Sequence, residues 1–300
     1  SARTIMQVAA RNKRLFMSIG ARSDVLRGKD CNRYTFHVDI PVTVMVNAAG
    51  QALLREGLVK GKRIFSITSD YLFGHDLAKA AKNFYAANGG TQVGDELVAT
   101  DATDFSPYLL KVRQAKPDLV STNLGGNQVT NFVKQYAEFG LPFPIAGFNL
   151  NTADAWAAGE GNLSGIWPTV WHHDLDIPAS KTFVADFTKK YGKPPENHAW
   201  IEYVTLKIMA QAMAETKSTD SDTLIAYFEK EPQFDLLKAR KGYFRSWDHQ
   251  LMQEAYPFTV KPKGQAKDQW DFLKLGAAVP AADQPLEVLA PTKEQSECKM

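Results

Sequence analysis

Residues 63–90 read RIFSITSDYLFGHDLAKAAKNFYAANGG and contain a complete strand–loop–helix unit. Arg63–Ser69 is an apolar run of strand length, and the apolar residues of Asp76–Ala87 recur at helical spacing. Asn88-Gly89-Gly90 signals the end of a helix, because glycine readily adopts the left-handed conformation that closes many helices. This stretch therefore predicts a β-strand followed by an α-helix.

The same alternation of patterns fills the first half of the chain and is typical of a mostly parallel sheet covered by helices. The expected strands are Leu15–Ile19, Tyr34–Val38, Arg63–Ser69, Thr91–Val98, Asp118–Leu124 and Pro144–Asn149. The expected helices are Thr4–Asn12, Val42–Glu56, Asp76–Ala87, Ser106–Gln114 and Asn127–Phe139.

The pattern changes after Asn149, and no linker marks the change. We expect helices over Thr152–Ala158, Ala179–Tyr191, Asn197–Ala214 and Asp222–Lys230. Strands are expected over Gly165–His172, Lys241–Arg245, Glu254–Val260 and Trp270–Leu275, the last three antiparallel, followed by a surface tail from Pro280. If the chain forms two domains, it crosses between them more than once.

Composition restricts the class of protein. A chain of 300 residues with 44% apolar content suggests two globular domains, at roughly 100–200 residues each. A net charge of +2 without a basic block argues against a dedicated nucleic-acid-binding protein. The longest apolar runs, such as Leu15–Ile19, are too short for membrane insertion. The start at Ser1, without Met or signal peptide, suggests a processed or trimmed product.

Four loops that follow expected strands carry hydroxyl, amide and aromatic groups. They are 20–23 (GARS), 70–74 (DYLFG), 123–127 (NLGGN) and 148–151 (FNLN). The carboxyl ends of parallel strands meet at one edge of a sheet, where ligands bind in doubly wound folds. Together these loops predict a cleft for a small molecule.

Signals of catalysis or of metal binding are weak. There is no GxSxG elbow and no phosphate-binding GxxxxGK[ST] loop. Gly159–Ser164 imitates GxGxxG but follows no strand, so it is interpreted as a loop. His172 and His173 are neighbours in an expected strand and should point to opposite faces, which favours packing or surface roles over a metal site. Asp101 and Asp104 are expected to cap the helix that follows them.

Cys31 and Cys298 are the two cysteines of the chain. In a cytosolic protein they would be unrelated thiols, whereas in an exported protein they would suggest a single disulfide. The residues alone leave both interpretations open.

Four segments, taken in chain order, carry a resemblance to a known family. They are Gly28–Phe36 (GKDCNRYTF), Phe65–His75 (FSITSDYLFGH), Thr103–Ser106 (TDFS) and Lys134–Gly140 (KQYAEFG). They resemble the branched-chain amino-acid-type substrate-binding proteins of ABC transporters, and the similarity extends over essentially the whole chain. The family implies the type I periplasmic binding fold, in which two doubly wound α/β lobes, joined by three crossovers, close on a ligand.

The resemblance also implies a division of the chain. Lobe one would comprise residues 1–40 and 172–252 with the tail 276–300, and lobe two would comprise residues 41–171 and 253–275. Family members begin with further strands and helices before the point equivalent to Ser1, so lobe one is expected to be incomplete. Relatives with a cysteine in the GKDC segment carry another near the C-terminus, which implies a disulfide between Cys31 and Cys298.

The family's ligand contacts fall on particular positions of this sequence. The resemblance implies that Ala21–Ser23 hold a carboxylate, that Phe73, with Tyr71 beside it, walls the cleft, and that Asn123–Asn127 face the ligand. Tyr203 matches a recurrent tyrosine, with packing in the core of lobe one as the alternative. The complete expected set is Ala21, Arg22, Ser23, Tyr71, Phe73, Asn123, Gly125, Phe148, Asn149 and Tyr203.

One position departs from the family. Amino-acid-binding members place a glutamate, which pairs with the ligand's ammonium, where this chain has Asn149. A buried ammonium needs a carboxylate partner, so Asn149 favours an aromatic or other non-amino carboxylate over leucine, isoleucine or valine. Tyr71, Phe73 and Phe148 offer apolar faces, and Arg22 either turns inward to pair with the ligand or remains a solvated loop residue.

The resemblance implies an exported, periplasmic protein that binds a small organic acid and delivers it to an ABC-transporter permease. The intact protein is expected to be a monomer, whereas a truncated one could dimerise through an exposed sheet edge. No catalysis, cofactor, metal, nucleic acid or membrane insertion is expected. A ligand-sensing domain of the same fold and an α/β enzyme using the same cleft remain the alternatives. A sensor would need a fused receptor or DNA-binding segment, and an enzyme would need an acid–base or nucleophile–base set.

Overall fold

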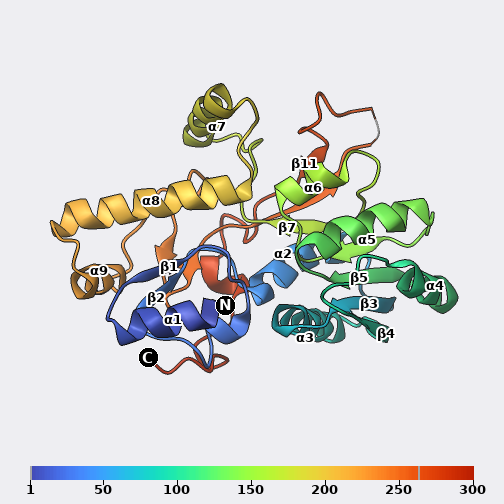
Figure 1. Cartoon of the computed structure of the whole chain (residues 1–300), viewed down its shortest axis with the longest axis horizontal. Coiled ribbons are helices and arrows are strands. Elements are labelled where there is room, and N and C mark those ends of the chain that lie inside the picture. Colours follow the sequence, from blue (N-terminus) through green and yellow to red (C-terminus); the bar gives the residue numbers. More distant parts are fainter. Residues whose placement is uncertain (1, 263) are drawn as a thin grey trace. The chain divides into compact units, whose positions relative to one another are not determined.

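The computed structural model describes residues 2–262 and 264–300, which divide into two compact units (Figure 1). Unit 1 consists of Ser1–Pro41, Val170–Glu254 and Pro280–Met300, and unit 2 of Val42–Thr169 and Ala255–Val279. The chain crosses between the units after Pro41, Thr169 and Glu254, and its tail then returns to unit 1.

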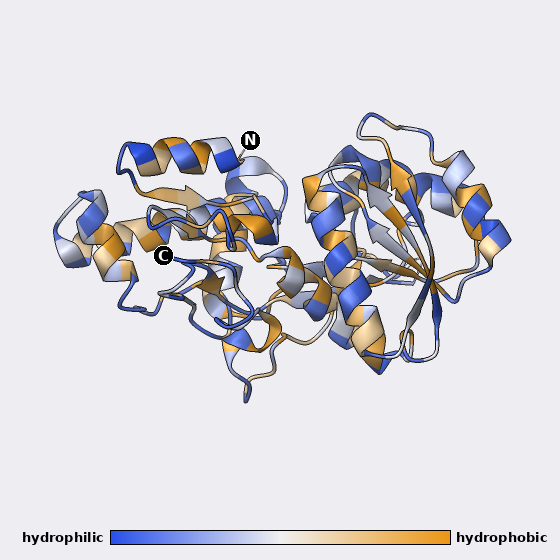
Figure 2. Cartoon of the chain, turned by 90° about the horizontal axis from the view of Figure 1, so that it is seen from below, coloured by the Kyte–Doolittle hydropathy of each residue, from blue (hydrophilic) through white to orange (hydrophobic). Residues whose placement is uncertain are grey.

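Unit 2 is built on a parallel four-stranded sheet with the order β4-β3-β5-β6. The strands are β3 (Arg63–Ser69), β4 (Thr91–Val98), β5 (Leu119–Asn123) and β6 (Ile145–Gly147). The helices are α2 (Val42–Arg55), α3 (Leu72–Ala87), α4 (Ser106–Ala115), α5 (Asn127–Glu138) and α6 (Thr152–Ala158). In Figure 2 hydrophobic and hydrophilic colours alternate along these helices, as expected for helices with one buried face.

Both faces of the central strands β3 and β5 are buried. Ile64 and Leu119 contribute to a core shared with α2 and α3, whereas their neighbours Phe65 and Val120 contribute to a core shared with α4 and α5. Successive side chains of a strand point to opposite faces, so both positions must be apolar when helices cover both sides. Accordingly Ile64, Phe65 and Ile67 of β3 are all buried.

A second sheet of unit 2 is antiparallel and has three strands. Its central strand β10 (Tyr256–Val260) pairs with β7 (Trp167–Thr169) on one side and with β11 (Leu273–Leu275) on the other. A Cβ atom at Gly147 would lie 2.0 Å from the ring of Trp167. Glycine at this position therefore allows the tryptophan to pack against the end of β6.

Unit 1 contains the parallel pair β1 (Phe16–Ser18) and β2 (Thr35–His37), extended by a bridge from His37 to Gln250. It also contains the hairpin of β8 (Tyr243–Phe244) and β9 (Leu251–Met252). Its helices are α1 (Ala2–Arg11), α7 (Pro178–Tyr191), α8 (Asn197–Thr216) and α9 (Ser221–Phe228), with short 3₁₀ helices η1 (Asp24–Leu26) and η2 (Leu286–Leu289). Buried aromatic rings form its core: Phe36 contacts Phe228 and Phe244 and stacks on His249.

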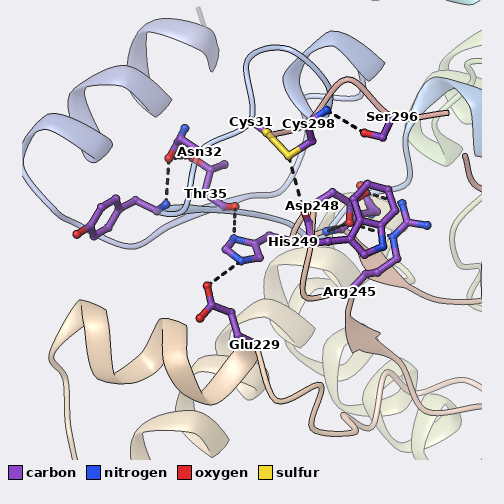
Figure 3. Close-up of a disulfide and its surroundings, with 12 residues drawn as sticks. Cys31, Asn32, Thr35, Glu229, Arg245, Asp248, His249, Ser296 and Cys298 are labelled. Atoms are coloured by element: carbon purple, nitrogen blue, oxygen red, sulfur yellow. Dashed lines mark hydrogen bonds and ion pairs between the residues drawn. A yellow bond between two sulfur atoms is a disulfide. The ribbon is translucent and has the colours of Figure 1, made fainter. Parts of the chain in front are cut away.

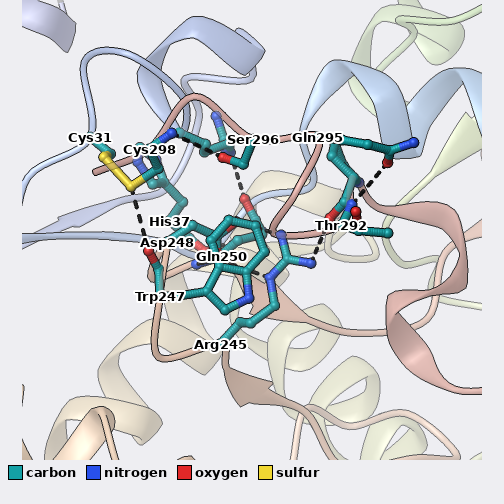
Figure 4. A network of polar contacts seen from close by, with 12 residues as sticks. Cys31, His37, Arg245, Trp247, Asp248, Gln250, Thr292, Gln295, Ser296 and Cys298 are labelled. Atoms are coloured by element: carbon teal, nitrogen blue, oxygen red, sulfur yellow. Dashed lines mark hydrogen bonds and ion pairs between the residues drawn. A yellow bond between two sulfur atoms is a disulfide. The ribbon is translucent and has the colours of Figure 1, made fainter. Parts of the chain in front are cut away.

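The predicted disulfide between Cys31 and Cys298 is confirmed, with an S–S distance of 2.08 Å and Cα atoms 5.6 Å apart (Figure 3). It attaches the tail of unit 1 to the loop before β2. Arg245 holds the tail at a second point, because it donates a hydrogen bond to the Pro291 carbonyl (2.9 Å). The same guanidinium pairs with Asp248 and lies 3.9 Å over the Trp247 ring (Figure 4).

The structure differs from the sequence predictions in local details. Helix α3 begins at Leu72 rather than at Asp76, so the expected loop 70–74 includes the first helical turn. A Cβ atom at Gly74 would lie 2.1 Å from the Ser69 carbonyl oxygen, and the glycine therefore lets this turn start directly after β3. The two-residue strand β9 is too short to show a periodic pattern.

The prediction for the adjacent histidines is wrong in its geometry. Strand β7 ends at Thr169, so His172 and His173 lie beyond it and do not alternate between two faces. Their ring centroids are 4.2 Å apart.

No helix within residues 2–262 and 264–300 has both the length and the apolar character needed to span a membrane.

Candidate ligand-binding site

The carboxyl-terminal edge of the unit 2 sheet brings three of the predicted residues together. Tyr71 precedes α3, is 40% exposed, and has its ring centroid 6.1 Å from that of Phe73. Gly125 follows β5, and a Cβ atom there would lie 2.2 Å from the Tyr71 hydroxyl oxygen and 3.3 Å from a Phe73 ring atom. The loops after β3 and β5 therefore form one continuous surface.

A cavity of about 540 Å³ lies at this edge of unit 2. Hydroxyl, amide, carboxylate and backbone groups line it. The lining residues are Tyr71, Thr100, Asp101, Ala102, Thr103, Gly125, Gly126, Asn127, Gln128 and Asn131. Of the predicted set, Tyr71 and Gly125 belong to this lining, whereas Phe73, Asn123, Phe148 and Asn149 do not.

The sequence analysis did not predict that the loop after β4 forms part of the cavity wall. Asp104 precedes the N-cap residue Phe105 of α4, and its carboxylate accepts a hydrogen bond from the Ser106 backbone N–H (2.9 Å) at the helix start, close to the predicted role. Asp101 instead lines the cavity, together with the threonines beside it. The signal for this role was available, because the loop follows a strand of the same parallel sheet.

A buried polar network fixes the loop after β5. The backbone N–H of Gly125 donates to the Ser69 hydroxyl (3.2 Å), which also contacts the Gln128 side-chain oxygen. The Gln128 amide donates to the Ala99 carbonyl (2.7 Å) and so joins the loops after β4 and β5. Neither Ser69 nor Gln128 was among the predicted residues.

Asn123, at the end of β5, is fully buried. Its amide donates to the Thr68 hydroxyl (3.0 Å), which in turn donates to Asp95 (2.7 Å). Its carbonyl oxygen accepts no hydrogen bond from the part of the chain that the structure describes. Asn123 thus carries a buried acceptor behind the cavity wall.

The residues after β6 are also buried. Phe148 has no exposed surface and packs with Tyr85 in the core shared with α2 and α3, so it presents no face to a solute here. Asn149 is 7% exposed, and its amide donates to the Leu124 carbonyl (3.2 Å). A neutral amide therefore occupies this strand end.

In unit 1, the predicted loop 21–23 is held by Arg27, a residue that sequence reasoning missed. Its buried guanidinium donates to the carbonyl oxygens of Ala21 (2.7 Å), Ser23 (3.1 Å) and Asp39 (3.0 Å) and to the Gln250 side chain (2.5 Å). Burial lowers the pKa of Arg27 to about 10, which leaves it charged at neutral pH. Its partner Gln250 is 223 positions away in sequence, so no local pattern indicates this role.

Arg22 turns inward rather than into solvent. Its Nε donates to the buried Asp39 carboxylate (2.6 Å), and its side chain is 10% exposed. His198, at the start of α8, interacts electrostatically with both residues. The hydrogen bond that its ring donates to the Glu196 carboxylate raises the pKa of His198. The loop of unit 1 therefore lies beside a cluster of charged and titratable groups.

Tyr203, the last predicted residue, lies on α8 and is 42% exposed. Its ring stacks on Phe183 of α7 with centroids 4.5 Å apart. The tyrosine thus covers a helix pair of unit 1 without being fully buried.

The chain forms two α/β units and crosses between them several times, and polar loops gather at one edge of the unit 2 sheet. This is the architecture of the type I periplasmic binding fold. The chain belongs to the family described as periplasmic binding protein, whose sequence model matches residues 1–266. This family and fold are those of transport-associated binding proteins, not of enzymes, and the family is extracytoplasmic.

Individual relatives agree with this assignment. The Leu/Ile/Val-binding protein homolog 4 of Brucella melitensis is 26% identical over 213 residues, which cover 68% of this chain and 49% of the relative. The chain thus spans about half the length of the curated relatives it matches. A branched-chain amino acid ABC transporter periplasmic ligand-binding protein from Burkholderia xenovorans is 25% identical, with a TM-score of 0.86 over 100% of this chain and 78% of that one.

A solute-binding protein of an ABC transporter from R. palustris, solved in complex with benzoate, shares the fold. Its TM-score is 0.82 at 20% identity, and the match covers 100% of this chain and 78% of that one.

Proposed function

We propose that this protein is the exported solute-binding component of an ABC transporter and that it captures a small organic carboxylate. Membership of the periplasmic binding protein family supports the transport role. In this proposal units 1 and 2 are the two lobes of the family fold, and a membrane permease receives the solute. The ligand-sensing and enzymatic alternatives have no specific support in the residues described above.

The observation that carries the ligand class is the chemistry of the unit 2 strand ends. Tyr71 offers an aromatic face, the exposed Asn127 offers an amide at the cavity, and Asn149 is neutral. Aromatic rings pack well against an aromatic side chain, and amide N–H groups donate to a carboxylate. These features support an aromatic acid as the solute.

Arg22 and Ser23 are the proposed contacts from unit 1. The Nε of Arg22 donates to Asp39 (2.6 Å), and its role toward the solute carboxylate stays a proposal that rests on the family resemblance. Tyr203 is not needed for this arrangement. Its stacking on Phe183 supports a packing role.

Asp101 favours a second candidate, an amino acid. It is an exposed carboxylate at the rim of the cavity, and it would provide the negative partner that Asn149 does not provide for an ammonium group. The two ligand classes therefore predict different effects of replacing this residue.

Isothermal titration calorimetry on the full chain with benzoate, cinnamate and leucine tests the proposal. We expect an aromatic acid to bind, Tyr71→Ala to weaken binding by about tenfold or more, and the exposed Tyr191→Ala to leave it unchanged. Leucine binding in the micromolar range that is lost in Asp101→Asn, with no response to either aromatic acid, would establish the amino-acid alternative.

A further inference from the structure

The segment that follows β7 places three potential metal ligands next to one another. We propose that His172, His173 and Asp174 of unit 1 form a binding site for a divalent transition-metal ion, with Zn²⁺ as the best-matched ion. One donor atom of each side chain lies within 4.8 Å of the donors of the other two. This inference does not depend on the identity of the solute.

The separations suit a single ion. Nδ1 of His172 is 3.6 Å from one carboxylate oxygen of Asp174, and Nε2 of His173 is 3.6 Å from the other. Zinc binds imidazole nitrogen and carboxylate oxygen at about 2.0–2.2 Å, so neighbouring ligands of a tetrahedral ion are about 3.3–3.5 Å apart. Two of the donor separations are therefore within a few tenths of an ångström of the spacing that an ion requires, and all donors lie within 4.8 Å of one another.

The protonation state of His172 also suits a ligand. The Asp174 backbone N–H donates to its Nδ1 (3.2 Å), so that nitrogen carries a lone pair and the ring proton is on Nε2. The lone pair points toward the segment that holds the carboxylate. A bound ion would take this lone pair in place of the backbone hydrogen bond.

Packing restricts the segment before any ion binds. Trp171, immediately before the histidines, stacks on Trp200 of α8 with centroids 6.1 Å apart and contacts Phe183 edge to face at 5.8 Å. His172 is buried, whereas the Asp174 side chain is 41% exposed. Packing therefore holds the buried His172 in place, and the exposed side of Asp174 leaves a path through which an ion can enter.

The donor set determines the class of ion. Two imidazoles and one carboxylate match the ligands of zinc and similar ions, whereas Ca²⁺ and Mg²⁺ prefer oxygen alone. Three protein ligands leave a fourth position for water or another small ligand.

The test uses the full chain after treatment with a chelator. Titration with ZnCl₂ in a calorimeter is expected to show one site, and Zn²⁺ is expected to raise the thermal unfolding temperature because it binds only the folded state. Asp174→Asn, at an exposed position, and His173→Gln are each expected to weaken Zn²⁺ binding by about tenfold or more. CaCl₂ is expected to give no comparable signal.

His75→Gln is the matched control. His75 is also a histidine beside an acid, with Nε2 2.9 Å from Asp70, but it belongs to a pair without a second imidazole. It is expected to keep full Zn²⁺ affinity. Circular dichroism of each variant separates loss of a ligand from loss of the fold. Zn²⁺ binding that is absent in the parent chain, or unchanged in folded Asp174→Asn and His173→Gln, would overturn the proposal.

Discussion

Gly125 lies against the side chain of Tyr71, so close that a Cβ atom at position 125 would fall 2.2 Å from the tyrosine hydroxyl oxygen. The loop after β5 thereby determines where the exposed ring after β3 can lie. This relationship joins two residues that are separated by 54 positions in the sequence.

Gly125→Ala is expected to displace the Tyr71 ring and to weaken binding of the solute by about tenfold or more, because the ring is a proposed contact. The free energy of unfolding should change by less than about 1 kcal/mol, since the clashing atom is the far end of a partly exposed side chain. Calorimetry and denaturant unfolding measure the two effects. Gly28→Ala is the control, because its added Cβ would have its nearest neighbouring atom at 3.4 Å, an ordinary contact. Equal solute affinity in the two variants would contradict a role for this contact.

Loss of the disulfide is expected to destabilise unit 1. The Cys31→Ser/Cys298→Ser double variant removes a cross-link between residues 267 positions apart, for which the chain-entropy model sets an upper limit of about 6 kcal/mol. Thermal unfolding should occur at lower temperature, and limited proteolysis should remove the tail 280–300 sooner. A reducing agent should lower the stability of the parent chain but not that of the double variant. Equal stability of the two proteins without reductant would refute this prediction.

Removal of the Arg27 side chain is expected to be among the most damaging changes in unit 1. Arg27→Met leaves buried carbonyl oxygens of the loop 21–23 without their donor and should lower the free energy of unfolding by about 3 kcal/mol or more. The exposed Arg11→Met should change it by less than about 0.5 kcal/mol. Urea unfolding compares the variants. A cost as small as that of the control would show that this loop does not depend on the buried arginine.

Lys238 is expected to make stability rise with pH in the alkaline range. Burial lowers its pKa to about 7, although its ammonium contacts Gln253, the Glu254 carbonyl and the Trp200 ring. Between pH 7 and about 10.4, the unfolded chain keeps a proton that the folded chain releases, so the free energy of unfolding increases across this window.

The Lys238→Met variant isolates this contribution. Its stability relative to the parent should be highest below pH 7 and should decline as the pH rises toward 10, whereas exposed Lys189→Met should show a flat difference. Urea unfolding at pH 6, 8 and 9.5 provides the comparison. A parent–variant difference that does not change with pH would mean that Lys238 titrates alike in both states.

The sequence was most informative where local patterns decide the structure. Strands β3 and β4 have the predicted bounds. The central strand β3 is buried on both faces, and its apolar residues Ile64, Phe65 and Ile67 made it recognisable. The disulfide followed from the family resemblance rather than from any property of the two cysteines. These features depend on short segments or on a conserved arrangement of the whole fold.

Other features depend on distant partners and left no local signal. Nothing in the sequence near Arg27 indicates a buried role, which depends on contacts with Asp39 and Gln250. The inward orientation of Arg22 depends on the same aspartate. Phe148 follows a strand, as a ligand-contacting residue would. Its side chain nevertheless packs in the core shared with α2 and α3. The contacts of such side chains become visible only when the elements are assembled.

The bond between Cys31 and Cys298 joins the first and the last segment of unit 1, so most of the polypeptide is a covalent ring. A single cut anywhere in unit 2 would open this ring without releasing a fragment until the disulfide is reduced. Unit 2 therefore consists of two insertions, Val42–Thr169 and Ala255–Val279, each held at both ends by one covalently closed domain. New chain ends placed in one of its exposed loops would still leave all segments of unit 1 connected.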